Sequence, residues 1–439
     1  MNTVRAAGLG DGAAPLARWR AADGLHYGLL GLPLAFCLLP LYVLMPNLYA
    51  SQWGVPLGAL GAVLLGARLI DALIDPLLGR VCDRAFAHSL GAVWTLGGCA
   101  AALLALGFAL LFAPPAIGPA ALLWWAAGCL ALTYPAASLL TVAHQAWGAM
   151  LGGDALYRSR VVAWREGWGL LGVLLAAATP ALLGLPALVV LLCLGLLLGW
   201  FAWLRAPRPA PRSQDAPAQV PPGVLWLPWR HRAFRRLLLV FMLNGIASAI
   251  PATLLLFFMQ DRLQASAALQ SAALLVYFGC GALSMPLWLR CVARQGLVRS
   301  WRLGMLLSIA VFLGASALGA GDGAWFLLVC ALSGLALGSD LAIPGALLAG
   351  AIEQAGQRGR AEGAYFGWWH FASKLNLALA AGLALPLLAW LGYVPGTRDA
   401  QATAVLSAAY CLLPCALKAM ACGALRLLPT SPSAQPHTP

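Results

Sequence analysis

Three charged residues stand within one apolar stretch of the chain, ARLIDALIDPLLGR. Arg68, Asp71 and Asp75 are spaced three and four residues apart, so a helix places them on one face. Two carboxylates one turn apart repel each other unless a cation compensates them, and Arg68 can neutralise one. Oxygen ligands suit hard cations. The pattern predicts a site for a proton or a monovalent cation; the alternative is a closed structural network of the three charges.

Further ionisable residues lie deep in other apolar stretches. Lys374, in FASKLNL, is one of only two lysines, and we expect Asp71 or Asp75 to be the acid that it needs. Asp340, in GSDLAIP, is expected either to pair with Lys374 or to hydrogen bond a substrate hydroxyl group. Lys418 is expected to extend its ammonium group to the membrane surface. Three residues are assigned to a coupling and charge network: Arg68, Lys374 and Asp340.

Other polar and aromatic residues are candidates for a solute cavity and for a gate on the cytoplasmic side. The cavity candidates lie in TVAHQAW and beside Lys374: Thr141, His144, Gln145, Trp369 and His370. The gate candidates lie in GRVCDR and WRE: Gly79, Asp83, Arg84, Arg165 and Glu166. For His370 the alternative is an ordinary packing role, and for the charge pairs it is a solvated surface pair of little stabilising value.

The elements that position these residues are predicted to be transmembrane helices. Of the 439 residues, 62% are hydrophobic and 9% are charged, against about 25% charged in soluble proteins. This composition excludes a soluble globule, and the continuous apolar runs are unlike the alternating strands of a β-barrel. Twelve runs are long enough to cross a hydrocarbon core of about 30 Å: 25–50, 56–79, 91–112, 120–143, 166–184, 186–204, 236–260, 267–289, 301–319, 325–348, 363–390 and 402–425.

The positions of the basic residues predict the orientation. Of the 27 basic residues, 22 fall on the N-terminal tail, on the connections that follow the second, fourth, sixth, eighth and tenth apolar runs, and on the C-terminal end. Only Arg262 and Arg398 fall on the other side. Because basic residues concentrate in cytoplasmic loops, both termini are expected in the cytoplasm. The net charge of +13 is then explained without a nucleic-acid partner.

One long polar interruption, rich in proline and arginine, divides the chain into halves. We expect a cytoplasmic N-terminal tail at 1–24, a six-helix half at 25–204, a cytoplasmic linker at 205–235, a second six-helix half at 236–426 and a disordered tail at 427–439. Two short repeats support a duplication: Pro76 aligned with Pro286, and Glu166-Gly167 with Glu362-Gly363. The predicted fold is all-α and polytopic, with two parallel six-helix halves, the major facilitator layout.

Several stretches resemble the glycoside–pentoside–hexuronide:cation symporters, the melibiose-permease-like branch of the major facilitator superfamily. They are ARLIDALIDPLLGRVCDR, LPLYVLMPNLYA, GDALYRSRVVAWREG and YFGWWHFASKLNLALAAGLALPLLAWLGY. The resemblance implies that Asp71 and Asp75 hold a cation and that Lys374 lies near it. The sugar-binding acids of the family are absent, because helix 1 has none and Thr141 stands at the helix-4 place. Gly350 replaces the acid after helix 10.

The sequence therefore predicts a secondary active transporter and no enzyme. We expect sodium- or proton-coupled symport of a sugar or glycoside-like solute by alternating access, with no cofactor and no metal ion other than a sodium at Asp71 and Asp75. The partners are the small-molecule substrate and membrane lipids, and we expect a monomer in a bacterial inner membrane. One alternative is a proton-coupled transporter or exporter of a non-sugar solute, with Lys374, His370 and Asp340 as the relay. A more distant one is a membrane-embedded, metal-dependent lipid-phosphate transferase.

Overall fold

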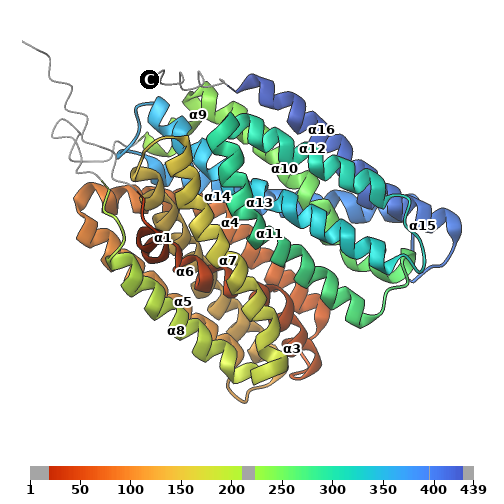
Figure 1. The fold of residues 1–439 in the computed structure, drawn as a ribbon. Helices are drawn as coiled ribbons and strands as arrows, with labels where there is room; N and C mark the ends of the chain where they lie inside the picture. Colours follow the sequence, from red (N-terminus) through yellow and green to blue (C-terminus); the bar gives the residue numbers. More distant parts are fainter. Residues whose placement is uncertain (1–18, 210–222, 395, 429–439) are drawn as a thin grey trace, which may run out of the picture.

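The computed structural model describes residues 19–209, 223–394 and 396–428, and all regular elements in these ranges are helices (Figure 1). Most of the expected N-terminal tail, the centre of the expected linker and nearly all of the expected tail at 427–439 lie outside the described residues. The described part of the linker includes two short elements, η2 (Val224–Trp226) and α9 (Leu227–Arg230).

The first half of the chain begins with an interrupted helix. Pro33, Pro40 and Pro46 each remove a backbone donor, and the helix divides into α1 (Ala21–Gly28), α2 (Gly31–Phe36), the π-helical η1 (Pro40–Leu44) and α3 (Met45–Ser51). The long helices that follow are α4 (Leu57–His88), α5 (Leu90–Phe112), α6 (Pro119–Met150), α7 (Ala155–Leu183) and α8 (Leu185–Leu204).

The second half repeats this order of long helices. They are α10 (Arg232–Phe257), extended by η3 (Phe258–Arg262), α11 (Ala267–Gln295), α12 (Leu297–Ala315), α13 (Gly323–Gln354) and α14 (Glu362–Trp390). The last one is again interrupted, into α15 (Ala400–Ser407), η4 (Ala408–Leu412), α16 (Leu413–Ala424) and η5 (Leu425–Leu427).

Eleven of the described helical segments are long and apolar enough to cross a membrane. The 32-residue α4 is long enough as well, but its charged residues keep it out of that set. With α4 counted, the order agrees with the twelve predicted spans. The predicted span 166–184 is corrected, because α7 begins at Ala155. Arg165 and Glu166 therefore lie inside a helix and do not open it.

The two halves are related as the first sequence repeat predicts. Pro76 and Pro286 stand at the same position counted from the first residues of α4 and α11. The second repeat was a wrong alignment: Glu362 is the first residue of α14, whereas Glu166 lies about three turns inside α7. The parallel arrangement of the halves rests on the helix order and on the first repeat.

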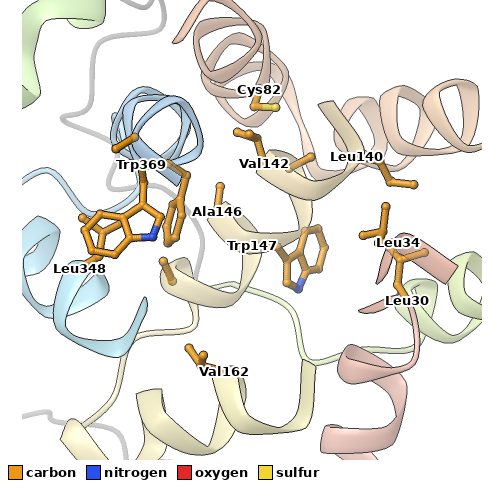
Figure 2. Packing of buried hydrophobic residues seen from close by; sticks show 14 of the residues in the cluster. Leu30, Leu34, Cys82, Leu140, Val142, Ala146, Trp147, Val162, Leu348 and Trp369 are labelled. Carbon is orange, nitrogen blue, oxygen red and sulfur yellow. The ribbon is translucent and has the colours of Figure 1, made fainter. Parts of the chain in front are cut away.

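The halves meet where α4 packs on α14 and where α7 packs on both α11 and α13, with a smaller contact between α6 and α14 (Figure 1). Apolar residues of both halves also share one core, in which Trp369 and Leu348 of the second half lie near Ala146 and Val162 of the first (Figure 2). We call the end of the bundle with the connections at 151–154 and 355–361 the basic end, because the predicted cytoplasmic arginines are placed there.

Glycines bring α4 and α14 into backbone contact near the basic end. A Cβ atom on Gly79 would collide with the carbonyl group of Gly363. A Cβ atom on Gly367 would lie 2.6 Å from the carbonyl oxygen of Asp75. Side chains at these positions would separate the helices. The predicted gate residue Gly79 therefore lies in a contact between the halves, and its contribution here is close packing.

We expect Gly79→Ala to destabilise the closed arrangement by about 1–3 kcal/mol, because the added methyl group meets backbone atoms that cannot turn away. Gly66→Ala is the matched control on α4, since no atom lies within 4 Å of its Cβ position. It should be neutral or slightly stabilising. Thermal unfolding of the purified protein in detergent compares the two, and equal midpoints would contradict the close contact.

Candidate functional site

One lysine connects the two halves at the predicted cation site. Lys374 Nζ on α14 lies 2.7 Å from Asp71 Oδ2 and 2.8 Å from Asp75 Oδ2, both on α4. It donates a further hydrogen bond of 2.8 Å to Asp75 Oδ1. The expectation that Lys374 finds its acid in the other half is confirmed. Both aspartates are paired with the same ammonium group.

A serine that the sequence analysis did not include completes the oxygen cluster around this ammonium group. Lys374 Nζ donates to Ser138 Oγ on α6 at 2.8 Å, and Ser138 donates to Asp71 Oδ1 at 2.9 Å. The carbonyl oxygen of Asp71 is 3.4 Å from Nζ. Both aspartates and Ser138 are buried, while the lysine side chain remains 22% exposed. Three helices thus surround one cation with carboxylate, hydroxyl and carbonyl oxygens.

Arg68 does not neutralise either aspartate, contrary to expectation. Its guanidinium carbon lies 4.2 Å from the centre of the Tyr42 ring, which is a cation–π arrangement. Within the described ranges it makes no ion pair, because Lys374 already occupies both carboxylates. The structure thus separates Arg68 from the acids that share its helix face.

Asp340 belongs to a different network, which lies inside the second half. Its Oδ2 atom is 2.9 Å from Lys418 Nζ, and its Oδ1 atom accepts a 2.9 Å hydrogen bond from Trp301 Nε1. Lys418 also donates to Asn244 Oδ1 at 2.8 Å. Two expectations were therefore wrong: Asp340 does not pair with Lys374, and Lys418 is buried and does not reach the membrane surface. A buried ammonium requires an acid, and Asp340 is that acid.

The halves are joined at the basic end by a buried carboxylate. Asp83 of α4 accepts hydrogen bonds from the backbone nitrogens of Gly363 (2.6 Å) and Ala364 (2.8 Å). These nitrogens belong to the first turn of α14, whose donors have no partner within the helix. A carboxylate is also favoured there by the helix dipole. Asp83 therefore makes a contact across the halves, whereas Arg84, its expected gate partner, has an exposed side chain.

A second set of contacts at the basic end was missed by the sequence analysis. Arg158 Nη1 of α7 is 2.6 Å from Glu353 Oε2 of α13, and Arg358 Nη1 is 3.0 Å from Glu353 Oε1. Arg358 also donates to the carbonyl oxygens of Met150 and Leu151. The sequence held one signal for these contacts. Corresponding connections of the two halves carry both acidic and basic residues, in GDALYRSR and in AIEQAGQRGR. Arg165 and Glu166, two of the predicted gate residues, form an ion pair with each other inside α7.

Most of the predicted cavity residues are engaged in packing. His144 is fully buried, and its Nε2 atom is 2.8 Å from the carbonyl oxygen of Tyr27. The Thr141 hydroxyl donates to the carbonyl oxygen of Ala137 at 2.7 Å, and Trp369 is buried and stacks on a phenylalanine ring.

Two of the cavity candidates remain close to the interface between the halves. Gln145 is half-buried beside Arg158 and Arg165, and its Oε1 atom has no hydrogen-bond partner among the described residues. His370 lies within electrostatic reach of Lys374 and Arg165. Of the five predicted cavity residues, Gln145 lines a small pocket between the halves, together with Gly345 and Ala349 of α13.

The sequence matches the family model described as MFS/sugar transport protein over residues 24–430. No match was found among curated proteins. Solved structures share the fold at low identity. The fucose:proton symporter FucP of E. coli is 14% identical, with a TM-score of 0.65 over 94% of this chain and 100% of that one. A bacterial homologue of the iron transporter ferroportin, in an outward-facing state, is 16% identical with a TM-score of 0.65 over 92% and 99%. The proton:xylose symporter XylE is 14% identical, with a TM-score of 0.56 over 90% and 93%.

The buried pair of Asp340 and Lys418 gives a direct test of the network in the second half. Lys418→Met leaves the largely buried Asp340 carboxylate without its counter-ion and should destabilise the protein by about 3–5 kcal/mol. The double variant Asp340→Asn, Lys418→Met should recover most of this loss. Thermal unfolding in detergent measures both. An unchanged midpoint for Lys418→Met would mean that the ammonium group reaches the membrane surface after all.

Proposed function

The chain belongs to the MFS/sugar transport protein family of the major facilitator superfamily, and from that premise we propose that it is a cation-coupled symporter. In this proposal sodium or a proton drives the uptake of a sugar or glycoside-like solute by alternating access. The resemblance to the glycoside–pentoside–hexuronide:cation symporters supports the finer family assignment. We further propose a bacterial inner-membrane location, with the basic end in the cytoplasm, and a monomer.

The oxygen cluster around Lys374 is the observation that carries the proposal. Two carboxylates, the Ser138 hydroxyl and the Asp71 carbonyl group converge on one ammonium nitrogen. Oxygen atoms of these kinds are the ligands that a hard monovalent cation takes when it leaves water. The ammonium group is itself a monovalent cation. A site that holds it has the charge and the ligands to hold sodium, or to hold a proton on one carboxylate.

The charges of this cluster favour exchange of the ammonium group with the coupling cation. Two carboxylates and one ammonium group leave a net charge of −1, which is unfavourable inside the bilayer. A proton or sodium compensates it. Because the lysine side chain is partly exposed, it can leave the carboxylates when the cation arrives. The exchange removes an attraction between α4 and α14, and so connects cation binding to the contact between the halves.

In the proposed transport cycle, this state is closed to solute at the basic end of the bundle. The contacts of Asp83 and of the Arg158–Glu353–Arg358 group join the halves at the basic end. A solute therefore enters from the opposite end in this state. Release to the cytoplasm requires these contacts to break while the halves close at the other end.

The structure gives less support to the proton relay considered for a non-sugar solute. That relay needs Asp340 near Lys374 and His370, but Asp340 is paired with Lys418 inside the second half. A lipid-phosphate transferase is excluded by the family, which consists of transporters. The cation site at α4 and α14 is therefore the preferred origin of coupling.

Uptake into proteoliposomes tests the proposal with a panel of radiolabelled mono- and disaccharides. Asp71→Asn and Asp75→Cys should each abolish accumulation against a gradient, because each removes one charge of the cation site. The energy at stake is about 2.3 kcal/mol for one charge moved through 100 mV, or roughly forty-fold accumulation. Inward sodium and proton gradients are imposed separately to identify the ion.

Asp399→Asn is the control for this experiment, because an asparagine retains the N-cap of α15 and the residue is exposed. It should accumulate solute like the wild type. Concentrative uptake by Asp71→Asn or Asp75→Cys would show that the cation site lies elsewhere. Uptake of no sugar under either gradient would refute the sugar substrate.

A further inference from the structure

A short segment before the second half is packed at the basic end against the helices of the cation site. It comprises η2, α9 and the start of α10, and we call residues 224–236 the anchor segment. Trp368 Nε1, near the beginning of α14, donates a 2.8 Å hydrogen bond to the carbonyl oxygen of Leu225. The centre of the Trp368 ring lies 5.2 Å from that of Trp226 and 5.1 Å from that of Trp229. Because η2 also contacts α4, the anchor segment touches both halves.

Two tryptophans of the anchor segment are exposed in spite of these contacts. Trp226 is 58% exposed and Trp229 is 36% exposed. The amphipathic indole ring is favoured at the level of the lipid headgroups, where one part of the ring meets acyl chains and the other meets water. The two rings therefore indicate that the anchor segment lies at the membrane surface of the basic end.

The anchor segment also carries a cluster of positive charge. Arg230 ends α9, and Arg232, Arg235 and Arg236 begin α10, all with exposed side chains. Among the described residues, no acidic side chain forms an ion pair with any of the four. Like charges at this spacing repel each other, and the helix dipole disfavours cations in a first turn. An anion at this place would compensate the repulsion.

We propose that the anchor segment binds an anionic phospholipid of the leaflet at the basic end. Its phosphate group binds among Arg230, Arg232 and Arg235, since guanidinium groups form charge-assisted hydrogen bonds with phosphate oxygens. Its acyl chains lie beside Trp226 and Trp229. The inference goes beyond the proposed transport function and depends neither on the coupling ion nor on the solute.

The position of this lipid connects it to the contact between the halves. Trp368 joins the anchor segment to the beginning of α14, and Asp83 of α4 accepts hydrogen bonds from Gly363 and Ala364 in the first turn of that helix. A lipid that holds the anchor segment therefore also stabilises the beginning of α14. We expect lipid binding to raise the stability of the state that is closed at the basic end.

Charge alone does not distinguish the anchor segment, because other arginines of the basic end are exposed as well. Arg294 of α11 and Arg299 and Arg302 of α12 are three such residues. The tryptophans of these two helices, Trp288 and Trp301, are buried. This second group offers the same charge without exposed indole rings, and it supplies the matched control for the anchor segment.

Thermal unfolding of the purified full chain in detergent tests the proposal. Phosphatidylglycerol or phosphatidylcholine with the same acyl chains is added in increasing amounts. We expect phosphatidylglycerol to raise the unfolding midpoint to a plateau and phosphatidylcholine to leave it nearly unchanged. The triple variant Arg230→Gln, Arg232→Gln, Arg235→Gln should need about tenfold more phosphatidylglycerol for half of the effect. Arg236 is retained because it donates to the carbonyl oxygen of Leu427.

The control is the triple variant Arg294→Gln, Arg299→Gln, Arg302→Gln, which loses the same charge from the same end. It should change the amount of lipid needed by less than about twofold. Glycerol 3-phosphate, which has the phosphate group without acyl chains, should leave the midpoint of the wild type unchanged at millimolar concentration. Both triple variants leave the cation site intact, so their response to the coupling cation is measured separately from their response to lipid.

Vesicles with brominated acyl chains add an independent readout, because bromine quenches the fluorescence of tryptophans that it contacts. The wild type should be quenched more by brominated phosphatidylglycerol than by brominated phosphatidylcholine, and the double variant Trp226→Phe, Trp229→Phe should lose this difference. Three results would overturn the inference: equal effects of the two lipids, equal losses in the two triple variants, or stabilisation by glycerol 3-phosphate alone. The last result would identify a soluble phosphate compound as the ligand.

Discussion

The contact between one lysine and two buried carboxylates is the interaction on which the rest of the structure depends. An ionised aspartate in the middle of a bilayer costs about 2.5–3.5 kcal/mol on insertion scales, and α4 carries two. Neither finds its counter-ion in its own half, because Arg68 stacks on Tyr42. The ammonium group of Lys374 supplies it from the other half. The two halves are therefore held together by charges that neither half can bury alone.

The remaining charges divide into those inside one half and those between the halves. Asp340 and Lys418 pair within the second half and connect α13 with α16, so they are not broken when the halves rotate. Asp83 and Glu353 make their contacts across the halves at one end. Such contacts must break in a transport cycle. The distribution agrees with two internally rigid bodies whose relative position depends on a few polar contacts and on close backbone packing.

Much of the architecture was predictable from the sequence, because length, hydropathy and arginine placement depend on the bilayer alone. The pairing of Lys374 with the acids of α4 was also predictable, since a buried amine requires an acid. The choice of partner among several buried charges was not predictable, because it depends on which helices lie side by side. For this reason the sequence analysis assigned Lys418 to the membrane surface. The sequence also holds a stronger repeat: Trp94 and Trp301 stand at the same position of α5 and α12, and each begins a Trp-x-Leu-Gly sequence.

A cation titration tests most directly whether Lys374 occupies the site of the coupling cation. Thermal unfolding of the wild type, Asp71→Asn and Lys374→Ala is measured at increasing cation concentrations and at several pH values. If the ammonium group occupies the site of the coupling cation, Lys374→Ala removes a competitor. We expect this variant to bind sodium or a proton more tightly than the wild type, and Asp71→Asn to lose the cation-dependent stabilisation. A Lys374→Ala variant with weaker or unchanged cation affinity would contradict it.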